Sequence, residues 1–237
     1  VLRRLKSDVL KDLPEVIETN IPVELNDDQK KAYKKIWENK SSISSEAGSF
    51  FSVLGKLRSI CEGIGFEESA KVGKALEMIE NISLHKEKIL IFSYYLDPLD
   101  NLEKILNTKK IGFSKIVGED SREVREKNIE EFKTQEDKVV LLASSKVASE
   151  GLTLTEANNV IFLNKWWNPS SNYQARDRVV RIGQEKIVQV FNLFCVDTLE
   201  ERVLDILEEK EEVYKNIVDG LVDEKYVSNL IEDEILN

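Results

Sequence analysis

The segment QARDRVVRIGQ, residues 174–184, holds the side chains best suited to phosphate chemistry in this sequence. If the segment is helical, Gln174, Arg178 and Arg181 fall at positions i, i+4 and i+7 and share one face. Guanidinium groups are always charged, and their planar donors match phosphate oxygens. The spacing therefore predicts a phosphate-binding face. The alternative is a salt-bridged surface helix, for example with Asp177 paired to Arg181.

A second group of polar residues follows an almost fully apolar run. Ser144, Ser145 and Lys146 put two hydroxyls and an amine where a strand would end, and such groups commonly bind the phosphate backbone of nucleic acids. A little further on, Glu150 and Gly151 form a tight polar turn. These residues make up a second candidate binding site.

Two adjacent tryptophans, Trp166 and Trp167, lie beside Lys165 and Asn168. Neighbouring residues on a regular element point in different directions, so at most one of the two tryptophans should belong to the core. The other is a candidate for an exposed contact. The alternative is that both rings pack against a helix that begins near Pro169.

Some kinds of site are missing from the sequence. The Gly-Lys pairs at 55 and 73 lack the upstream glycine and the following Ser or Thr of a phosphate-binding loop. The Asp-Glu pairs at 223 and 233 lie in an acidic C-terminal segment rather than after a strand. The single histidine, His85, has no Cys or His nearby, so no metal site is predicted in this chain.

The elements that must position these groups alternate regularly from residue 88 onward. Short apolar runs separated by helical stretches are typical of an α/β fold with a parallel sheet covered by helices on both faces. In such a sheet, ligands bind outside the carboxyl ends of the strands. The runs lie at 88–93, 114–118, 139–144, 160–163 and 187–196, and the helical stretches at 96–106, 121–132 and 170–182.

The chain divides into four predicted parts. In order they are a connecting segment with a first strand (1–25), a helical subdomain (26–83), the α/β unit (84–198), and an amphipathic helix with an acidic tail (199–237). The first strand is expected at 21–25, and the helical subdomain should contain about three helices. The chain begins at Val1, which suggests a fragment of a longer protein.

The net charge of −10 argues at first against a nucleic-acid partner. However, residues 199–237 carry 13 acidic and 4 basic side chains, a net charge of −9, so the rest of the chain is close to neutral. A local DNA-binding patch is therefore compatible with the composition. No apolar run approaches the roughly 20 residues of a membrane helix, so no membrane partner is expected. The two cysteines, Cys61 and Cys195, are expected to be buried thiols in a reducing, intracellular setting.

The residues at 139–184 carry a family resemblance. VVLLASSKVASEGLTLTEANNVIFLNKWWNPSSNYQARDRVVRIGQ is similar to helicase motifs V and VI of the Swi/Snf family of ATPases, with a specific combination of Trp-Trp-Asn-Pro, Gln-x-x-x-Arg-x-x-Arg and Arg-Ile-Gly-Gln. KILIFSYYLDPLDNLEKIL resembles motif IV, and GEDSREVREKNIEEFK resembles the segment after it. LRRLKSDVLKDLP resembles the link between the two motor lobes, so the resemblance covers essentially the whole chain.

This resemblance implies a RecA-like lobe with a helical insert, taken from an ATP-dependent translocase or remodeller of double-stranded DNA. Arg178 and Arg181 would be arginine fingers, supported by Gln174, that reach the γ-phosphate of ATP. Glu150 and Gly151 would also contact the nucleotide. ATP and Mg²⁺ would be held mainly by an N-terminal RecA-like lobe that this sequence lacks, so the chain alone is predicted to be inactive as an ATPase.

The resemblance also implies DNA contacts and partners. The residues that would contact DNA are Ser93, Arg125, Ser144, Ser145, Lys146, Trp166 and Trp167. The partners would be double-stranded DNA, the N-terminal lobe of the same protein, and a protein or DNA-bound complex that the motor remodels. The expected location is intracellular, in the cytoplasm or nucleoid, or in the nucleus if the organism is a eukaryote.

The sequence departs from the family pattern in two places. Ala148 and Ser149 stand where the family usually has two glycines, and the added Cβ atoms restrict the backbone there. The segment CEGI, residues 61–64, replaces the family's Cys-Asn-His-Pro. Two alternatives remain open. One is a non-catalytic module that binds DNA or protein, and the other is a lobe of a strand-separating helicase.

Overall fold

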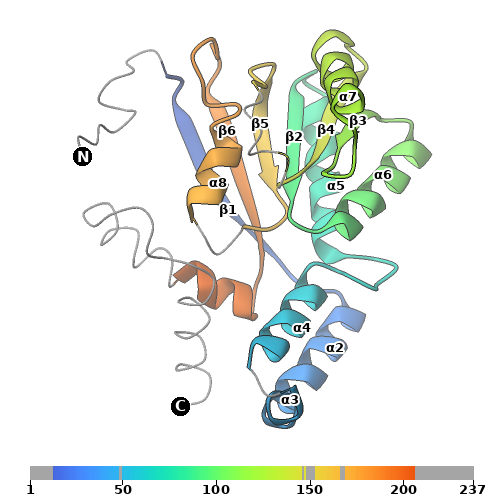
Figure 1. Cartoon of the computed structure of the whole chain (residues 1–237), viewed down its shortest axis with the longest axis vertical. Helices are drawn as coiled ribbons and strands as arrows, with labels where there is room; N and C mark the ends of the chain where they lie inside the picture. The colour runs from blue at the N-terminus through green and yellow to red at the C-terminus, as the bar shows by residue number, and fades with distance from the viewer. Residues whose placement is uncertain (1–12, 48–49, 146, 148–152, 166–168, 206–237) are drawn as a thin grey trace.

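The computed structural model describes residues 13–47, 50–145, 147, 153–165 and 169–205. Six parallel strands form one sheet in the order β1-β6-β5-β2-β4-β3 (Figure 1), which confirms the predicted parallel sheet. Because all strands run the same way, their carboxyl ends meet at one edge. The strands are β1 (Val16–Val23), β2 (Lys88–Ser93), β3 (Gly112–Ile116), β4 (Lys138–Ser144), β5 (Ala157–Phe162) and β6 (Val188–Cys195).

The first strand differs from the prediction, because β1 begins at Val16 rather than near residue 21. All eight of its residues pair with β6 at the edge of the sheet. An edge strand can carry exposed polar residues and a proline, since one of its sides is not hydrogen-bonded to another strand. The first half of β1 is therefore not an apolar run, because it contains polar residues such as Glu18 and Thr19.

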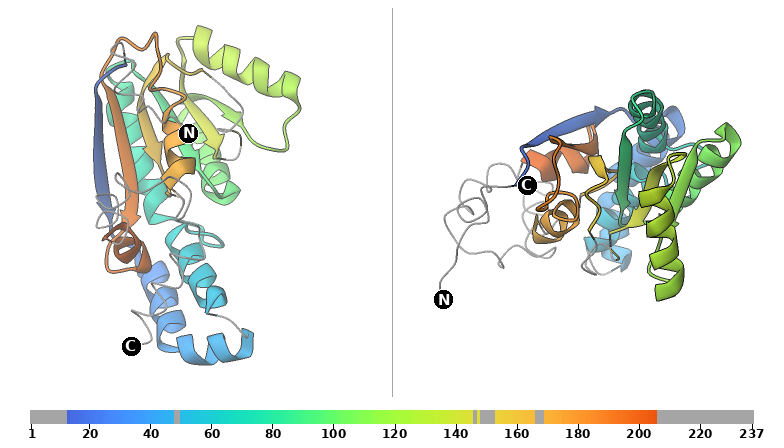
Figure 2. Two further views of the ribbon diagram at one scale, coloured as in Figure 1. Left: turned by 60° about the vertical axis from the view of Figure 1, so that its left-hand side comes forward. Right: turned by 90° about the horizontal axis from the view of Figure 1, so that it is seen from above.

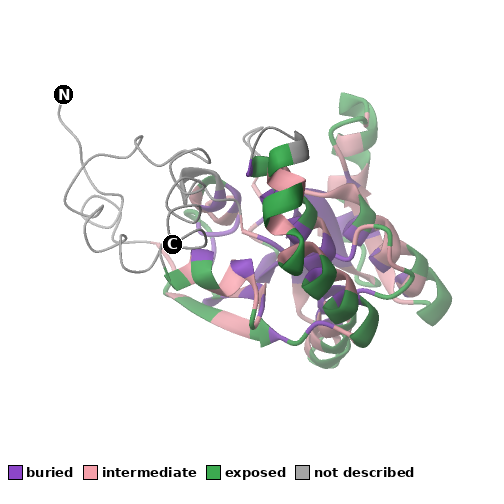
Figure 3. Cartoon of the chain, turned by 90° about the horizontal axis from the view of Figure 1, so that it is seen from below, coloured by how far each residue is buried: buried purple, intermediate pink, exposed green. Residues whose placement is uncertain are grey.

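Helices cover both faces of the sheet, as predicted. Leu90 and Phe92 of β2 contribute to a core with α7 and α8, whereas Ile89 and Ile91 contribute to a core with α5 and α6, because successive strand residues point to opposite faces. Figure 2 shows the two helix layers, and Figure 3 shows the sheet between them as the most buried part. These helices are α5 (Ala70–Ser83), α6 (Leu96–Lys109), α7 (Arg122–Thr134) and α8 (Pro169–Arg176).

The remaining helices form a group at the carboxyl end of the sheet (Figure 1). They are α2 (Asp27–Glu38), α3 (Lys40–Ala47) and α4 (Phe51–Cys61). Together with α5, four helices lie between residues 26 and 83, where about three were predicted. α5, which the prediction included in the helical subdomain, packs Val72, Ala75 and Ile79 against the sheet instead of against this group. The predicted boundaries of the helical subdomain stay a prediction. We call α2, α3 and α4 the insert.

The insert packs against a helix from the C-terminal part of the chain. Leu199 and Val203, from a helix described at 199–205, pack in the core of the insert. The Leu199 amide also donates a hydrogen bond to the Tyr33 hydroxyl at 2.7 Å. The rest of the helix predicted from 199 to 220 lies outside the described residues. Among the described helices, none is long and apolar enough to cross a membrane.

Candidate functional site

Serines meet where the central strands end. Ser93 of β2 and Ser144 of β4 are partners in register, and the Ser145 amide donates to the Ser93 carbonyl at 2.8 Å. The hydroxyls of Ser144 and Ser145 are buried, yet neither has a hydrogen-bond partner among the described residues. Buried hydroxyls are normally satisfied, so these two are candidates for contact with a ligand that is absent here. We call this region the carboxyl edge.

Ser93 differs from its two neighbours. Its side chain is fully buried, and its Oγ donates to the Tyr95 carbonyl at 2.8 Å. The same oxygen accepts from the Tyr95 amide at 3.1 Å and from Nδ2 of Asn164 at 3.1 Å. This hydroxyl is hydrogen-bonded inside the protein, and its contact with DNA stays a prediction. Ser93 holds the ends of β2 and β5 together.

Asn164 extends this contact toward the insert. Its Oδ1 accepts from the Tyr94 amide at 2.9 Å, and its Nδ2 donates to Glu62 Oε2 at 2.6 Å. Both side chains are buried. Neither residue stands out in the sequence, because a hydrogen bond between residues 102 positions apart leaves no local pattern. The end of β5 is therefore hydrogen-bonded to the turn that follows α4.

Glu62 also belongs to a buried ion cluster. Nζ of Lys71 lies 3.1 Å from Glu62 Oε1 and 2.7 Å from Glu200 Oε1, and the Lys71 side chain is only 1% exposed. Burial raises the pKa of Glu62, although Lys71 opposes the effect. Burial acts on Glu200 too, but Lys71 and the amide of Cys195 outweigh it and lower the pKa of Glu200. One cation thus joins the insert to the helix at 199–205.

The arginine segment is less helical than predicted. α8 ends at Arg176, and tight turns follow, so Gln174, Arg178 and Arg181 do not lie on one helix. Beyond α8, the Arg181 amide donates to the Val179 carbonyl at 2.9 Å instead of to a carbonyl one helical turn back, and the Arg178 carbonyl accepts from the Leu154 amide at 2.9 Å.

Further bonds tie the arginine segment to residues 153–157. Nη1 of Arg181 donates to the Thr153 hydroxyl at 2.7 Å. The buried Gln184 amide donates to the carbonyls of Thr155 at 3.0 Å and Ala157 at 2.8 Å. Gly183 has a φ of +98°, which favours glycine and lets the chain turn between Arg181 and Gln184. Gln184 stands in the Arg-Ile-Gly-Gln motif, so the sequence did carry a signal for it.

The arginine side chains still reach the surface. Arg181 and Gln174 are exposed, and Arg178 is half-buried with no hydrogen-bond partner for its Nε among the described residues. The segment lies against α8 and the start of β5, away from the carboxyl edge where Ser144 and Ser145 lie. The structure therefore separates the two predicted groups into two surfaces. Planar cationic donors of this kind fit phosphate oxygens.

The other predicted residues are divided between one described position and several that are not. Arg125 lies half-buried in the first turn of α7, which begins shortly after β3 ends, so it is on the same side of the sheet as Ser144. Lys146, Glu150, Gly151, Trp166 and Trp167 lie outside the described residues.

Within the described residues, one cluster has ligand atoms close enough to hold a metal. It consists of Cys61, Cys195 and Glu200, whose ligand atoms lie within 4.8 Å of one another. The carboxylate already binds Lys71, and a hydrogen bond to Cys61, together with burial, raises the pKa of Cys195. Mg²⁺ prefers oxygen ligands, so this cluster does not suit it.

Comparison with known proteins finds matches over the whole chain. Residues 70–183 match the helicase conserved C-terminal domain family. The chain is 34% identical to the uncharacterized ATP-dependent helicase MG018 of Mycoplasma genitalium, over 100% of its own length and 24% of that protein. It therefore spans about a quarter of the length of this curated relative.

The fold also matches solved structures. The SWI2/SNF2 ATPase core domain of Sulfolobus solfataricus superposes with a TM-score of 0.79 at 31% identity, over 99% of this chain and 51% of that one. The same core in complex with double-stranded DNA gives a TM-score of 0.76 at 30% identity, over 99% and 52%.

Proposed function

Because this chain belongs to the Swi/Snf family of ATPases, as a C-terminal helicase lobe, we propose that it forms half of an ATP-driven translocase on double-stranded DNA. The other half would be an N-terminal RecA-like lobe of the same protein. That lobe would hold ATP and Mg²⁺, since the described residues here offer no cluster of oxygen ligands that suits Mg²⁺. The complex of the Sulfolobus solfataricus core with double-stranded DNA supports the choice of nucleic acid.

Arg178 and Arg181 are the proposed arginine fingers. The observation that carries this role is that their segment is anchored. The Arg178 carbonyl and the side chains of Arg181 and Gln184 are all hydrogen-bonded to residues 153–157, while Arg181 remains exposed. A cation held this way has little freedom to lose when it meets a phosphate. When ATP is bound by the N-terminal lobe, these arginines would stabilise negative charge on its γ-phosphate. Gln174, exposed on α8, would support them.

The carboxyl edge is the proposed DNA surface. Ser144 and Ser145 would donate hydrogen bonds from their hydroxyls to DNA phosphates, and Lys146, Trp166 or Trp167, and Arg125 would make further DNA contacts. Ser93 would act by positioning, through its bonds to Tyr95 and Asn164. Closure and opening of the two lobes around ATP would shift this grip along the duplex. An intracellular location belongs to the same proposal, in keeping with the two buried free thiols.

The test is ATP hydrolysis. The chain alone should release no phosphate from ATP, with or without DNA. In a longer form with both lobes, Arg181→Ala should lower the DNA-stimulated rate by a factor of about 10³–10⁵, as for arginine fingers elsewhere. Its affinity for a DNA duplex should stay that of the wild type. Arg122→Ala is the matched control, because Arg122 is exposed on α7 and pairs only locally, with Glu126 at 2.7 Å.

Each contrary result points to another function. Hydrolysis that survives in Arg181→Ala removes the finger assignment and favours a DNA-binding module, provided that affinity falls steeply with salt. An absence of DNA binding even at low salt favours a protein partner instead. Displacement of one strand of the duplex favours a strand-separating helicase.

A further inference from the structure

Glu18 of β1 is the common partner of three side chains from different elements. Its Oε1 lies 2.6 Å from Lys165 Nζ and accepts from Asn192 Nδ2 at 2.8 Å. Its Oε2 lies 3.7 Å from Nη1 of Arg176. Burial raises the pKa of Glu18, but Lys165, Asn192 and Arg176 outweigh this effect and lower it. The carboxylate is therefore held in its charged form.

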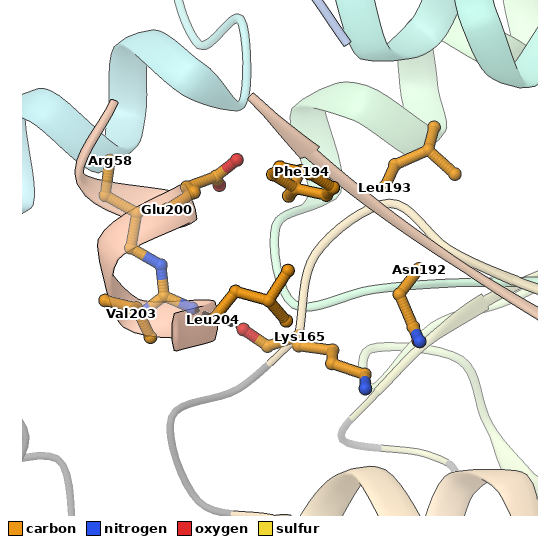
Figure 4. A pocket seen from close by; sticks show the side chains of 8 residues that line it. All are labelled: Arg58, Lys165, Asn192, Leu193, Phe194, Glu200, Val203 and Leu204. Atoms are coloured by element: carbon orange, nitrogen blue, oxygen red, sulfur yellow. Dashed lines mark hydrogen bonds between the residues drawn. The ribbon is translucent and has the colours of Figure 1, made fainter. Parts of the chain in front are cut away.

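The backbone of Lys165 places it at the carboxyl edge. Lys165 directly follows Asn164, whose amide is bonded to Ser93, and its carbonyl accepts a hydrogen bond from Arg58 Nη2 at 3.4 Å. The Lys165 side chain, however, is turned toward β6, and Figure 4 shows its amine beside the amide nitrogen of Asn192. Its charge is thus directed away from the edge on which its backbone lies.

The Lys165 side chain is not packed on all sides. It borders a cavity of about 40 Å³, so its four-carbon stem is not close-packed on that side. The Lys165 side chain is 28% exposed, and the Glu18 side chain is 34% exposed. An ion pair between partly exposed groups is weak and salt-sensitive, so a second anion can replace the carboxylate. The cavity is lined by Arg58, Lys165, Asn192, Leu193, Phe194, Glu200, Val203 and Leu204.

We propose that Lys165 is a further DNA-phosphate contact, and that Glu18 holds it in reserve until DNA arrives. The inference rests on the proposed DNA surface. In the DNA-free lobe, Glu18 neutralises Lys165. When DNA binds, a phosphate at the carboxyl edge replaces Glu18 as the ion-pair partner of the Lys165 ammonium. Glu18 then remains paired with Arg176. Because Arg176 ends α8, the same carboxylate then links the DNA surface to the helix that precedes the arginine segment.

The experiment measures the affinity of the 237-residue chain for a short DNA duplex over a series of salt concentrations. Lys165→Gln should weaken binding and reduce the slope of log affinity against log salt by about 0.9, the value for one phosphate contact. Glu18→Gln should strengthen binding about two- to fivefold, as expected when a weak competing ion pair is removed. In the double variant, the affinity should return to that of Lys165→Gln.

The non-additivity separates a specific exchange from a general charge effect. Glu24→Gln is the control, because Glu24 directly follows β1 and forms an exposed pair with Lys30, and its effect should be the same with or without Lys165. If Glu18→Gln strengthens binding equally when Lys165 is replaced, the proposal is overturned. An unchanged salt slope in Lys165→Gln also overturns it.

The proposed function fails in a different way. If the wild-type chain binds no duplex at any salt concentration, both the DNA surface and the reserve contact are wrong. If the wild type binds DNA, and the Lys165 and Glu18 variants bind it with the same affinity and salt slope as the wild type, the DNA surface stands without this contact. Circular dichroism checks that each variant remains folded at the assay temperature. Glu18→Asp retains the negative charge that binds Lys165, so its DNA affinity should be close to that of the wild type rather than to that of Glu18→Gln.

Discussion

At the scale of single residues, chemical type and environment contribute differently to the site. Arg178 and Arg181 stand out by type, since a guanidinium is charged in any surroundings. Glu62 is unremarkable in the sequence, yet the fold removes it from water and gives it Lys71 and Asn164 as partners. Its properties are therefore those of its surroundings. The pH dependence of stability makes this difference measurable.

Glu62→Gln should change how the free energy of unfolding depends on pH. Burial raises the pKa of Glu62 from 4.5 to about 7. Between these values the folded protein binds a proton that the unfolded chain does not, so stability falls as pH rises through this window. The wild type should therefore lose stability relative to the variant between about pH 4.5 and 7, by more than about 1 kcal/mol, since one pKa unit corresponds to about 1.4 kcal/mol.

Urea unfolding at several pH values provides the measurement. Glu67→Gln is the control, because Glu67 is exposed in the same turn. The comparison with wild type also removes the opposite contribution of groups such as Glu18, whose lowered pKa costs stability as pH falls. Parallel pH profiles for the wild type and Glu62→Gln would contradict the assignment.

At the scale of elements, turns and helix ends depend on a few backbone positions. The turn after α4 carries Glu62 and leads to Ser69 and α5, and Gly63 within it has a φ of +75°. A Cβ added at Gly63 would lie 2.3 Å from the Cβ of Ser69, closer than two carbon atoms can approach. This turn positions the carboxylate that binds Asn164, so the glycine supports the carboxyl edge.

Gly63→Ala should destabilise the fold by more than about 1 kcal/mol, because alanine meets both a strained backbone and a steric clash. Gly55→Ala in α4 is the matched control, since a Cβ there has no heavy atom within 4 Å. That change should stabilise the helix by about 0.5–1 kcal/mol. Urea unfolding measures both. Equal effects of the two substitutions would show that the turn is not constrained as described.

At the scale of the whole molecule, the buried ion cluster connects parts that pack in separate cores. The insert has one core, and each face of the sheet has another. Lys71 comes from α5 on the sheet, Glu62 from the end of the insert, and Glu200 from the helix at 199–205. Removing the cation would leave two buried carboxylates facing each other, which is strongly unfavourable.

Lys71→Met should lower the free energy of unfolding by about 3–5 kcal/mol and separate the insert from the sheet during unfolding. With Trp166 and Trp167 replaced by Phe, Trp37 in α2 remains as the single fluorescent reporter of the insert. Fluorescence and far-ultraviolet circular dichroism should then give coincident urea transitions in this background and an earlier fluorescence transition after Lys71→Met.

The matched control lies one turn further along α5. Lys74 pairs with Glu77 at 2.9 Å in an exposed position, so Lys74→Met should keep the transitions coincident and change stability by no more than about 0.5 kcal/mol. Coincident transitions with unchanged stability in Lys71→Met would show that the cluster does not couple the insert to the sheet.

Local patterns in the sequence account for most of the sheet. β2 and β4 are mostly buried runs of apolar residues, and a chain segment of this kind must be covered on both faces wherever it folds. The motifs likewise pointed to the serines at the strand ends and to Arg178 and Arg181. These features depend on residue type and short spacing, which are complete in the sequence.

Only the tertiary structure decided which groups meet. It ended α8 at Arg176 and bonded the Arg178 carbonyl to the Leu154 amide. It enclosed Ser93 and joined Glu18 to Lys165 across 147 residues. Hydrogen bonds and ion pairs between residues so far apart in the sequence follow from how strands and helices pack. Packing is a property of the whole chain rather than of any segment. The arginines were thus identifiable from sequence, whereas their anchoring and the partner of Lys165 required the fold.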